Sequence, residues 1–218
     1  MNIKGIIFDF DGVIVDSEPF WEKADSRLVA SEGKEMIPAA KKAVMGMKQS
    51  DSIKMIMKMH GIEGDPDEFM KRRQRMMEEY YSNEIPLTPG AFESIGSLNE
   101  AGIKMIIASS TPAYLVESCL RRFKLHEFFM SIVSGDDVEH GKPAPDIFLK
   151  ALSRLALPKN EVVVIEDSLP GLLGARAAEI TAVWFRNDHH PDAGVHADME
   201  IGSLKELKTV LRISSPRI

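Results

Sequence analysis

Short apolar runs alternate along the chain with segments in which apolar residues recur every three or four positions. The runs are apolar throughout, which is typical of parallel strands that are covered on both faces. They predict five strands, at residues 3–10, 104–108, 131–133, 162–165 and 181–185. Because helical segments separate these strands, the pattern predicts an α/β fold with an open, doubly wound parallel sheet.

Residues 18–84 interrupt this alternation, since they contain no convincing strand and are rich in Met, Lys, Glu and Ala. A connection of this length is far longer than the usual link between a strand and the next helix. The sequence therefore predicts a core domain of residues 1–17 and 85–218, with a helical domain of residues 18–84 inserted after the first strand. The methionines of the inserted segment are expected to pack its helices against one another.

Composition excludes several classes of protein. The 218-residue chain is 44% hydrophobic and 28% charged, which argues against a disordered or fibrous chain. A net charge of −6, without a separate block of Lys or Arg, argues against a nucleic-acid or membrane partner. No apolar run reaches the roughly 18 residues of a membrane span, and the single cysteine, Cys119, fits a reducing compartment. We expect a soluble, cytoplasmic protein that is a monomer by default.

Two of the predicted strands end in pairs of acidic residues. The first strand runs into Asp9 and Asp11, whose side chains lie on one side of an extended chain, about 6.5–7 Å apart. The strand at 162–165 runs into Glu166 and Asp167. If these strands are neighbours, up to four carboxylates meet at the sheet edge where open α/β folds bind ligands. Their mutual repulsion favours a hard divalent cation, and Mg²⁺ is the natural candidate, although each pair alone could also be a turn or a helix cap.

Two further segments carry groups that can bind phosphate. A third strand is followed by three hydroxyl residues, Ser109, Ser110 and Thr111. We expect Thr111 to cap the next helix and Pro112 to start it. The hydroxyls and the free N–H groups of the helix start would then face the same edge of the sheet. Lys142 lies in a proline-stiffened loop, where it could pair with both a phosphate and an acid. Taken singly, these segments could be an ordinary helix start and a surface lysine. Together with the acid pairs, they indicate phosphoryl transfer through an aspartyl-phosphate.

The order of four motifs resembles the haloacid dehalogenase superfamily over nearly the whole chain. The motifs are D-x-D-G-V from Asp9, A-S-S-T from Ala108, G-K-P-A-P-D-I-F from Gly141 and E-D-S-x-x-G from Glu166. The chain is most similar to the subfamily of β-phosphoglucomutase and the small sugar-phosphate phosphatases. This resemblance implies a Rossmann-like core and an inserted α-helical cap domain, whose closure excludes water and selects the substrate.

The resemblance also implies roles for individual residues of this chain. Asp9 is similar to the nucleophile that takes the phosphoryl group. Asp11 corresponds to the general acid that protonates the leaving oxygen and then activates water. Ser109 and Lys142 would hold the transferring phosphoryl group, with Ser110 nearby.

In the same resemblance, Mg²⁺ is bound by Asp9, by the backbone carbonyl of Asp11 and by Asp167, with Glu166 as a helper. The dehalogenases of the superfamily lack the acid two residues after the nucleophile and need no metal. Since this chain has Asp11 and the Glu166–Asp167 pair, the resemblance indicates an enzyme that acts on phosphate.

The choice between phosphatase and mutase depends on the predicted cap. The mutase pattern has an arginine where this chain has Gln49, with Lys48 beside it, and a histidine where this chain has Trp21. A guanidinium binds a second phosphate far better than an amide does. We therefore predict a Mg²⁺-dependent phosphatase for a small phosphorylated metabolite, with sugar phosphates as the expected class. A β-phosphoglucomutase-like phosphotransferase and a non-catalytic binding protein of this superfamily remain as alternatives.

Three other features are expected to be structural. The sequence predicts that Arg72, Arg73 and Arg75 line a solvated helix face and that His189 and His190 lie in a solvated polar loop. Cys119 falls on an apolar helix stripe, so we expect it to be buried and inert.

Overall fold

The computed structural model describes residues 2–44, 49–190 and 193–213 of the chain. It divides into two compact units. The core unit consists of Met1–Asp16 and Pro86–Ile218, and the helical unit consists of Ser17–Ile85. Each unit has a hydrophobic core of its own. Among the described helices, none has both the length and the apolar composition that a membrane span requires.

The core unit is built on a parallel sheet in the order β3-β2-β1-β4-β5-β6. Its strands are β1 (Gly5–Phe8), β2 (Lys104–Ser109), β3 (Ile132–Ser134), β4 (Val162–Glu166), β5 (Thr181–Phe185) and β6 (Met199–Ile201). The five predicted strands are all present. The sequence did not predict β6, because its three residues include an exposed Glu200 and form no apolar run.

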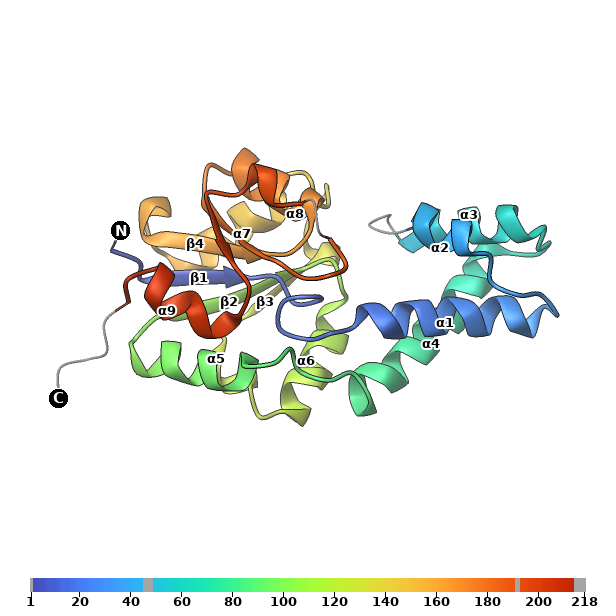
Figure 1. The fold of residues 1–218 in the computed structure, drawn as a ribbon, viewed down its shortest axis with the longest axis horizontal. Helices are drawn as coiled ribbons and strands as arrows, with labels where there is room; N and C mark the ends of the chain where they lie inside the picture. The colour runs from blue at the N-terminus through green and yellow to red at the C-terminus, as the bar shows by residue number, and fades with distance from the viewer. Residues whose placement is uncertain (1, 45–48, 191–192, 214–218) are drawn as a thin grey trace. The chain divides into compact units, whose positions relative to one another are not determined.

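Helices cover both faces of this sheet, as Figure 1 shows: α7 and α8 lie on one face and α5, α6 and α9 on the other. On the first face, Phe148 and Leu155 of α7 and Leu172 of α8 pack against Ile7 and Val164 of the strands. The predicted α/β, Rossmann-like fold is therefore confirmed. The α-helices are α5 (Ala91–Glu100), α6 (Ala113–Arg122), α7 (Asp146–Leu155), α8 (Leu169–Ala177) and α9 (Leu207–Val210). Short 3₁₀ helices lie at His126–Phe128, Gly135–Asp137, Lys159–Glu161, Ala193–His196 and Leu204–Glu206.

The strand order reverses at β1, which pairs with β2 on one side and with β4 on the other. At such a reversal the connections leave the sheet in opposite directions, and the carboxyl ends of the strands at this point are where open α/β sheets bind ligands. The chain leaves β1 through a tight turn in which Gly12 has a φ of +76°. A Cβ at this position would lie 2.2 Å from Oδ2 of Asp167, so only glycine fits the turn.

The described part of the helical unit consists of four helices, α1 (Glu18–Ser31), α2 (Pro38–Val44), α3 (Gln49–His60) and α4 (Pro66–Asn83). Asp65 starts α4, because its side chain accepts a hydrogen bond from the backbone N–H of Asp67 and Pro66 occupies the first turn. The core of the unit includes Leu28, Ile56 and Phe69 together with Met57, Met70 and Met76. The predicted packing role of the methionines is confirmed for these three.

Arg73 is buried within the helical unit, so the predicted solvated face is wrong for this arginine. Its Nε lies 2.7 Å from Oδ1 of Asp25, and its Nη2 donates to Oδ2 of the same carboxylate at 2.8 Å. Its Nη1 donates to Oγ of Ser52 at 3.0 Å, and the guanidinium lies 4.7 Å from the ring centroid of Trp21. The reason is helical spacing: position 73 lies four residues after the buried Phe69, and so on the core-facing side of α4.

We expect Asp25→Ala to lower the free energy of unfolding by about 3–5 kcal/mol, because it leaves a buried guanidinium without its counter-charge. The matched control is Glu117→Ala, which removes an exposed ion pair with Arg121 and should cost about 0–1 kcal/mol. Urea denaturation followed by circular dichroism measures both variants. Equally small losses would contradict the importance of the buried pair.

Candidate active site

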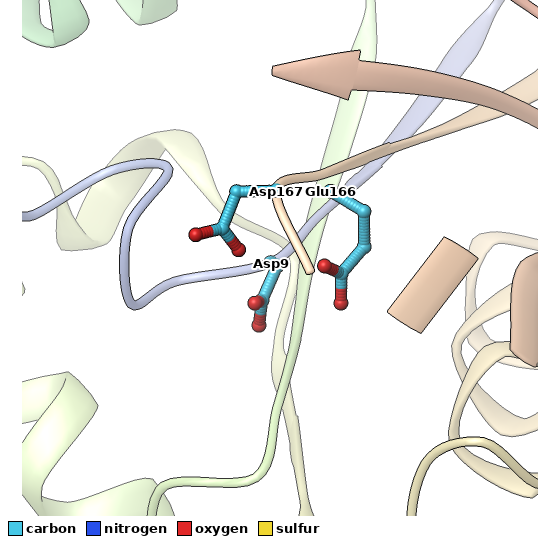
Figure 2. Close-up of side chains that lie close together, drawn as sticks. All are labelled: Asp9, Glu166 and Asp167. Carbon is cyan, nitrogen blue, oxygen red and sulfur yellow. The ribbon is translucent and has the colours of Figure 1, made fainter. Parts of the chain in front are cut away.

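Three buried carboxylates meet at the carboxyl ends of β1 and β4. Asp9 follows β1, Glu166 ends β4 and Asp167 follows it, and the two strands are hydrogen-bonded neighbours. One carboxylate oxygen of each residue lies within 4.8 Å of those of the other two. Figure 2 shows the three side chains grouped at this edge of the sheet. The structure thus brings together one acid of the first predicted pair and both acids of the second.

Lys142 lies against two of these acids and is itself 93% buried, with 7% of its side chain exposed. Its Nζ is 2.9 Å from Oδ1 of Asp9 and 2.5 Å from Oε1 of Glu166. Burial by itself lowers the pKa of Lys142, but the carboxylates of Asp9 and Glu166 more than offset this effect and hold it above its usual value. The lysine is therefore a fixed positive charge at the predicted nucleophile.

The electrostatics of this group favour binding of a cation. Burial, followed by the charge of Glu166, raises the pKa of Asp9 to about 8, although Lys142 acts in the opposite direction. Burial also raises the pKa of Asp167 well above its usual value, and the charges of Glu166 and Asp9 add to this effect. Among the described residues, Lys142 is the ammonium that pairs with this group of three carboxylates, so the group carries excess negative charge when all are ionised. A cluster of hard oxygen donors with excess negative charge fits Mg²⁺.

Glu166 is fully buried, and both of its oxygens are engaged. Oε1 contacts Lys142, while Oε2 accepts hydrogen bonds from the backbone N–H and the hydroxyl of Ser168, both at 3.0 Å. The start of α8 passes so close to the carboxylate that a Cβ on Gly171 would lie 1.8 Å from Oε1. The helix that follows β4 therefore has no room for a side chain at this point.

Asp11 interacts with β2 and the loop that follows it. Its Oδ2 accepts a hydrogen bond from the Thr111 hydroxyl at 2.7 Å and a longer one from the Ser109 hydroxyl at 3.3 Å. The predicted capping role of Thr111 is wrong, because Pro112 is the N-cap of α6. The sequence pointed to a hydroxyl at position 111 but not to its partner, which lies one hundred residues earlier in the chain. Ser110 is exposed in the same loop.

The candidate substrate residues of the predicted cap lie in the helical unit. The Trp21 ring lies against the Arg73 guanidinium and 6.4 Å from the Tyr81 ring, centroid to centroid. Gln49 is the first residue of α3 and is partly exposed. Lys48 lies outside the described residues.

The loop after β5 contains a site residue that the sequence did not reveal. Nδ2 of Asn187 donates a hydrogen bond to Oδ2 of Asp167 at 2.8 Å. The side chains of His189 and His190, which the sequence predicts to be solvated, are partly exposed, at 30% and 22%, and Nε2 of His190 lies 3.9 Å from Oδ2 of Asp167. Asn187 turns the loop back by accepting hydrogen bonds from both of their backbone N–H groups. An asparagine in a polar loop is a signal for such a turn but not for the distant acid that it binds.

Comparison with known proteins agrees with this geometry. The family described as haloacid dehalogenase-like hydrolase matches residues 6–185. The phosphorylated carbohydrates phosphatase of Thermotoga maritima is 32% identical over 84% of this chain and 84% of its own. Hexitol phosphatase B of Escherichia coli is 27% identical over 94% of this chain and 95% of its own. A crystal structure from Thermotoga maritima, named provisionally as a β-phosphoglucomutase, has a TM-score of 0.79 at 30% identity and covers 96% of this chain and 99% of its own.

The α/β fold together with the matching family and relatives identifies a hydrolase. The chain belongs to the haloacid dehalogenase-like hydrolase family. The predicted family and subfamily are thereby confirmed. The names of the relatives agree with the predicted enzyme class, a phosphoric monoester hydrolase.

We expect Gly171→Ala to destabilise the protein by about 1–3 kcal/mol, because the added methyl group overlaps the Glu166 carboxylate. The matched control is Gly96→Ala in α5, where the new methyl group has no described atom within 4 Å. This change should leave stability unchanged or raise it by up to about 1 kcal/mol, since alanine favours a helix interior. Urea denaturation measures both, and an equal effect of the two substitutions would contradict the close packing around Glu166.

Proposed function

We propose that this chain is a Mg²⁺-dependent phosphatase that hydrolyses a small phosphorylated carbohydrate through a phosphoryl group carried on Asp9. The observation that carries the proposal is the contact of Oδ1 of Asp9 with Lys142 in a buried cluster of acids. A carboxylate placed beside a fixed ammonium can approach a phosphate dianion, because the lysine offsets the repulsion between the two anions.

In the first half of the reaction, a carboxylate oxygen of Asp9 attacks the phosphorus, and the bond to the sugar oxygen breaks. Asp11, in its protonated form, gives its proton to that leaving oxygen. The hydroxyls of Thr111 and Ser109 hold Oδ2 of Asp11, and this contact orients the carboxyl group for the transfer. The product of this half is an aspartyl-phosphate and a free alcohol.

In the second half, Asp11 is a carboxylate and takes a proton from water as that water attacks the phosphorus. The bond between the phosphorus and Asp9 breaks, inorganic phosphate is released, and both acids return to their starting states. The same residue thus acts first as acid and then as base, as the reversed direction of proton flow requires.

The remaining site residues bind rather than react. Lys142, Ser109 and Ser110 hold the phosphoryl oxygens in this proposal. Asp9, Asp167 and the backbone carbonyl of Asp11 would hold Mg²⁺, and Glu166 would fix Lys142 beside them. When bound, Mg²⁺ offsets the negative charge of the acids and of the phosphoryl group in the transition state.

The helical unit would act as the cap that selects the substrate, with Trp21, Lys48 and Gln49 as candidate contacts. The carbohydrate class is supported by the names of two relatives, one acting on phosphorylated carbohydrates and one on hexitol phosphates. A mutase is the second candidate, because a structure 30% identical to this chain is named as a β-phosphoglucomutase. The amide of Gln49, in place of a guanidinium, favours the phosphatase.

We expect the wild-type protein to release inorganic phosphate from a panel of sugar 1-phosphates, sugar 6-phosphates and phosphoglycolate when Mg²⁺ is present. Asp9→Asn should abolish release because an amide is a poor nucleophile, and its unchanged circular dichroism spectrum would show that the fold is intact. EDTA should stop the reaction and added Mg²⁺ should restore it.

Three results would contradict this proposal. If Asp9→Asn turned over substrate as fast as the wild type, Asp9 could not be the nucleophile. If the wild type released phosphate in EDTA, the reaction would not need Mg²⁺. Conversion of β-glucose 1-phosphate into glucose 6-phosphate without phosphate release would identify a mutase instead.

A further inference from the structure

The side-chain amide of Asn187 makes four hydrogen bonds. Its Nδ2 donates to Oδ2 of Asp167 at 2.8 Å and to the backbone carbonyl of Gly12 at 3.2 Å. Its Oδ1 accepts from the backbone N–H groups of His189 and His190, at 3.0 and 3.1 Å. Both amide protons thus face acceptors and the oxygen faces two donors, so the amide has one orientation that satisfies every group.

These bonds connect the loops after three different strands. Gly12 lies in the turn after β1, Asp167 follows β4, and Asn187 itself follows β5. The Gly12 carbonyl is one peptide unit beyond that of Asp11, which the proposed function assigns to Mg²⁺. A single side chain therefore fixes two of the segments that would supply ligands to the cation.

The surroundings of Asp167 explain why a neutral donor is suited to this position. Its carboxylate is 95% buried and lies within 4.8 Å of those of Asp9 and Glu166, counted between the nearest ligand oxygens. A further acid at position 187 would add repulsion, and a lysine would compete with the cation. An amide stabilises the ionised carboxylate through N–H groups without a net charge, and it lowers the pKa that burial and the neighbouring acids raise.

The backbone of residue 167 is fixed from the same strand. Nε1 of Trp184, in β5, donates to the carbonyl oxygen of Asp167 at 3.2 Å. Trp184 at the end of β5 thus holds the main chain of this acid, and Asn187 just after the strand holds its carboxylate.

We propose that Asn187 is a positioning residue of the cation site: by holding Oδ2 of Asp167, it fixes the carboxylate that would bind Mg²⁺. This inference rests on the Mg²⁺ site of the proposed function. Residues that orient a metal ligand in this way typically contribute about 10–100-fold to metal affinity. A residue that only shaped the loop at 187–190 would affect stability and leave metal affinity unchanged.

The test is the dissociation constant of Mg²⁺ alone, measured by isothermal titration calorimetry on the purified full chain. Asn187→Leu has nearly the same size and removes all four hydrogen bonds, and it should weaken binding about 10–100-fold. Asn187→Ala serves the same purpose if the leucine variant does not fold. The matched control is His189→Ala, in the same loop as Asn187. This change removes the imidazole that contacts Asp16 but keeps the backbone N–H that donates to Asn187. It should bind Mg²⁺ as the wild type does.

The outcomes separate this inference from the proposed function. Asp167→Asn should bind Mg²⁺ far more weakly than the wild type, and it reports on the site itself. If Asp167→Asn loses affinity while folded Asn187 variants bind as the wild type does, the positioning role is overturned and the proposed function stands. An equal loss in His189→Ala would also overturn it, because the loop rather than the amide would then be responsible. If the wild type itself does not bind Mg²⁺, the cation site fails and this inference fails with it.

Discussion

The burial of three carboxylates between the ends of β1 and β4 is the constraint on which the rest of the site depends. Like charges this close raise one another's pKa and weaken the fold unless positive charge is supplied. Lys142 supplies part of it, through contacts with Asp9 and Glu166 that leave its ammonium almost fully buried. The remaining imbalance is what makes the cluster suited to a divalent cation and a phosphate ester, since the cation offsets the charge of both.

The sheet explains why these groups meet. Parallel strands place all their carboxyl ends at one edge, and the reversal of strand order at β1 puts β2 and β4 on either side of it. Residues at or just after the ends of these three strands, such as Asp9, Ser109 and Glu166, then lie at the same edge of the sheet although they are far apart in the sequence. The close approach of Gly12 to Asp167 and of Gly171 to Glu166 shows how tightly the connecting segments pack around the acids.

The sequence predicted the sheet and the acidic end of β1 and β4 because both leave a local signal, an apolar run that stops at a pair of acids. It did not predict β6, whose three residues carry no such run. It also missed the contacts made across the fold by Thr111, Asn187 and Arg73. A threonine near a helix start, an asparagine in a loop and an arginine on a helix each have a common local role. Their partners are fixed only when distant segments pack together, so no local pattern separates the two roles.

The central claim is that Asp9 carries the phosphoryl group, and direct trapping of that group tests it most directly. Acetyl phosphate has a good leaving group, so it should phosphorylate Asp11→Ala without help from an acid, while the missing base slows hydrolysis. Acid quenching, borohydride reduction and peptide mass spectrometry convert a phosphorylated aspartate into homoserine and locate it. The account predicts homoserine in place of Asp9 only when acetyl phosphate and Mg²⁺ are both present. An unmodified Asp9 under conditions in which the wild type hydrolyses acetyl phosphate, or modification of a different residue, would contradict it.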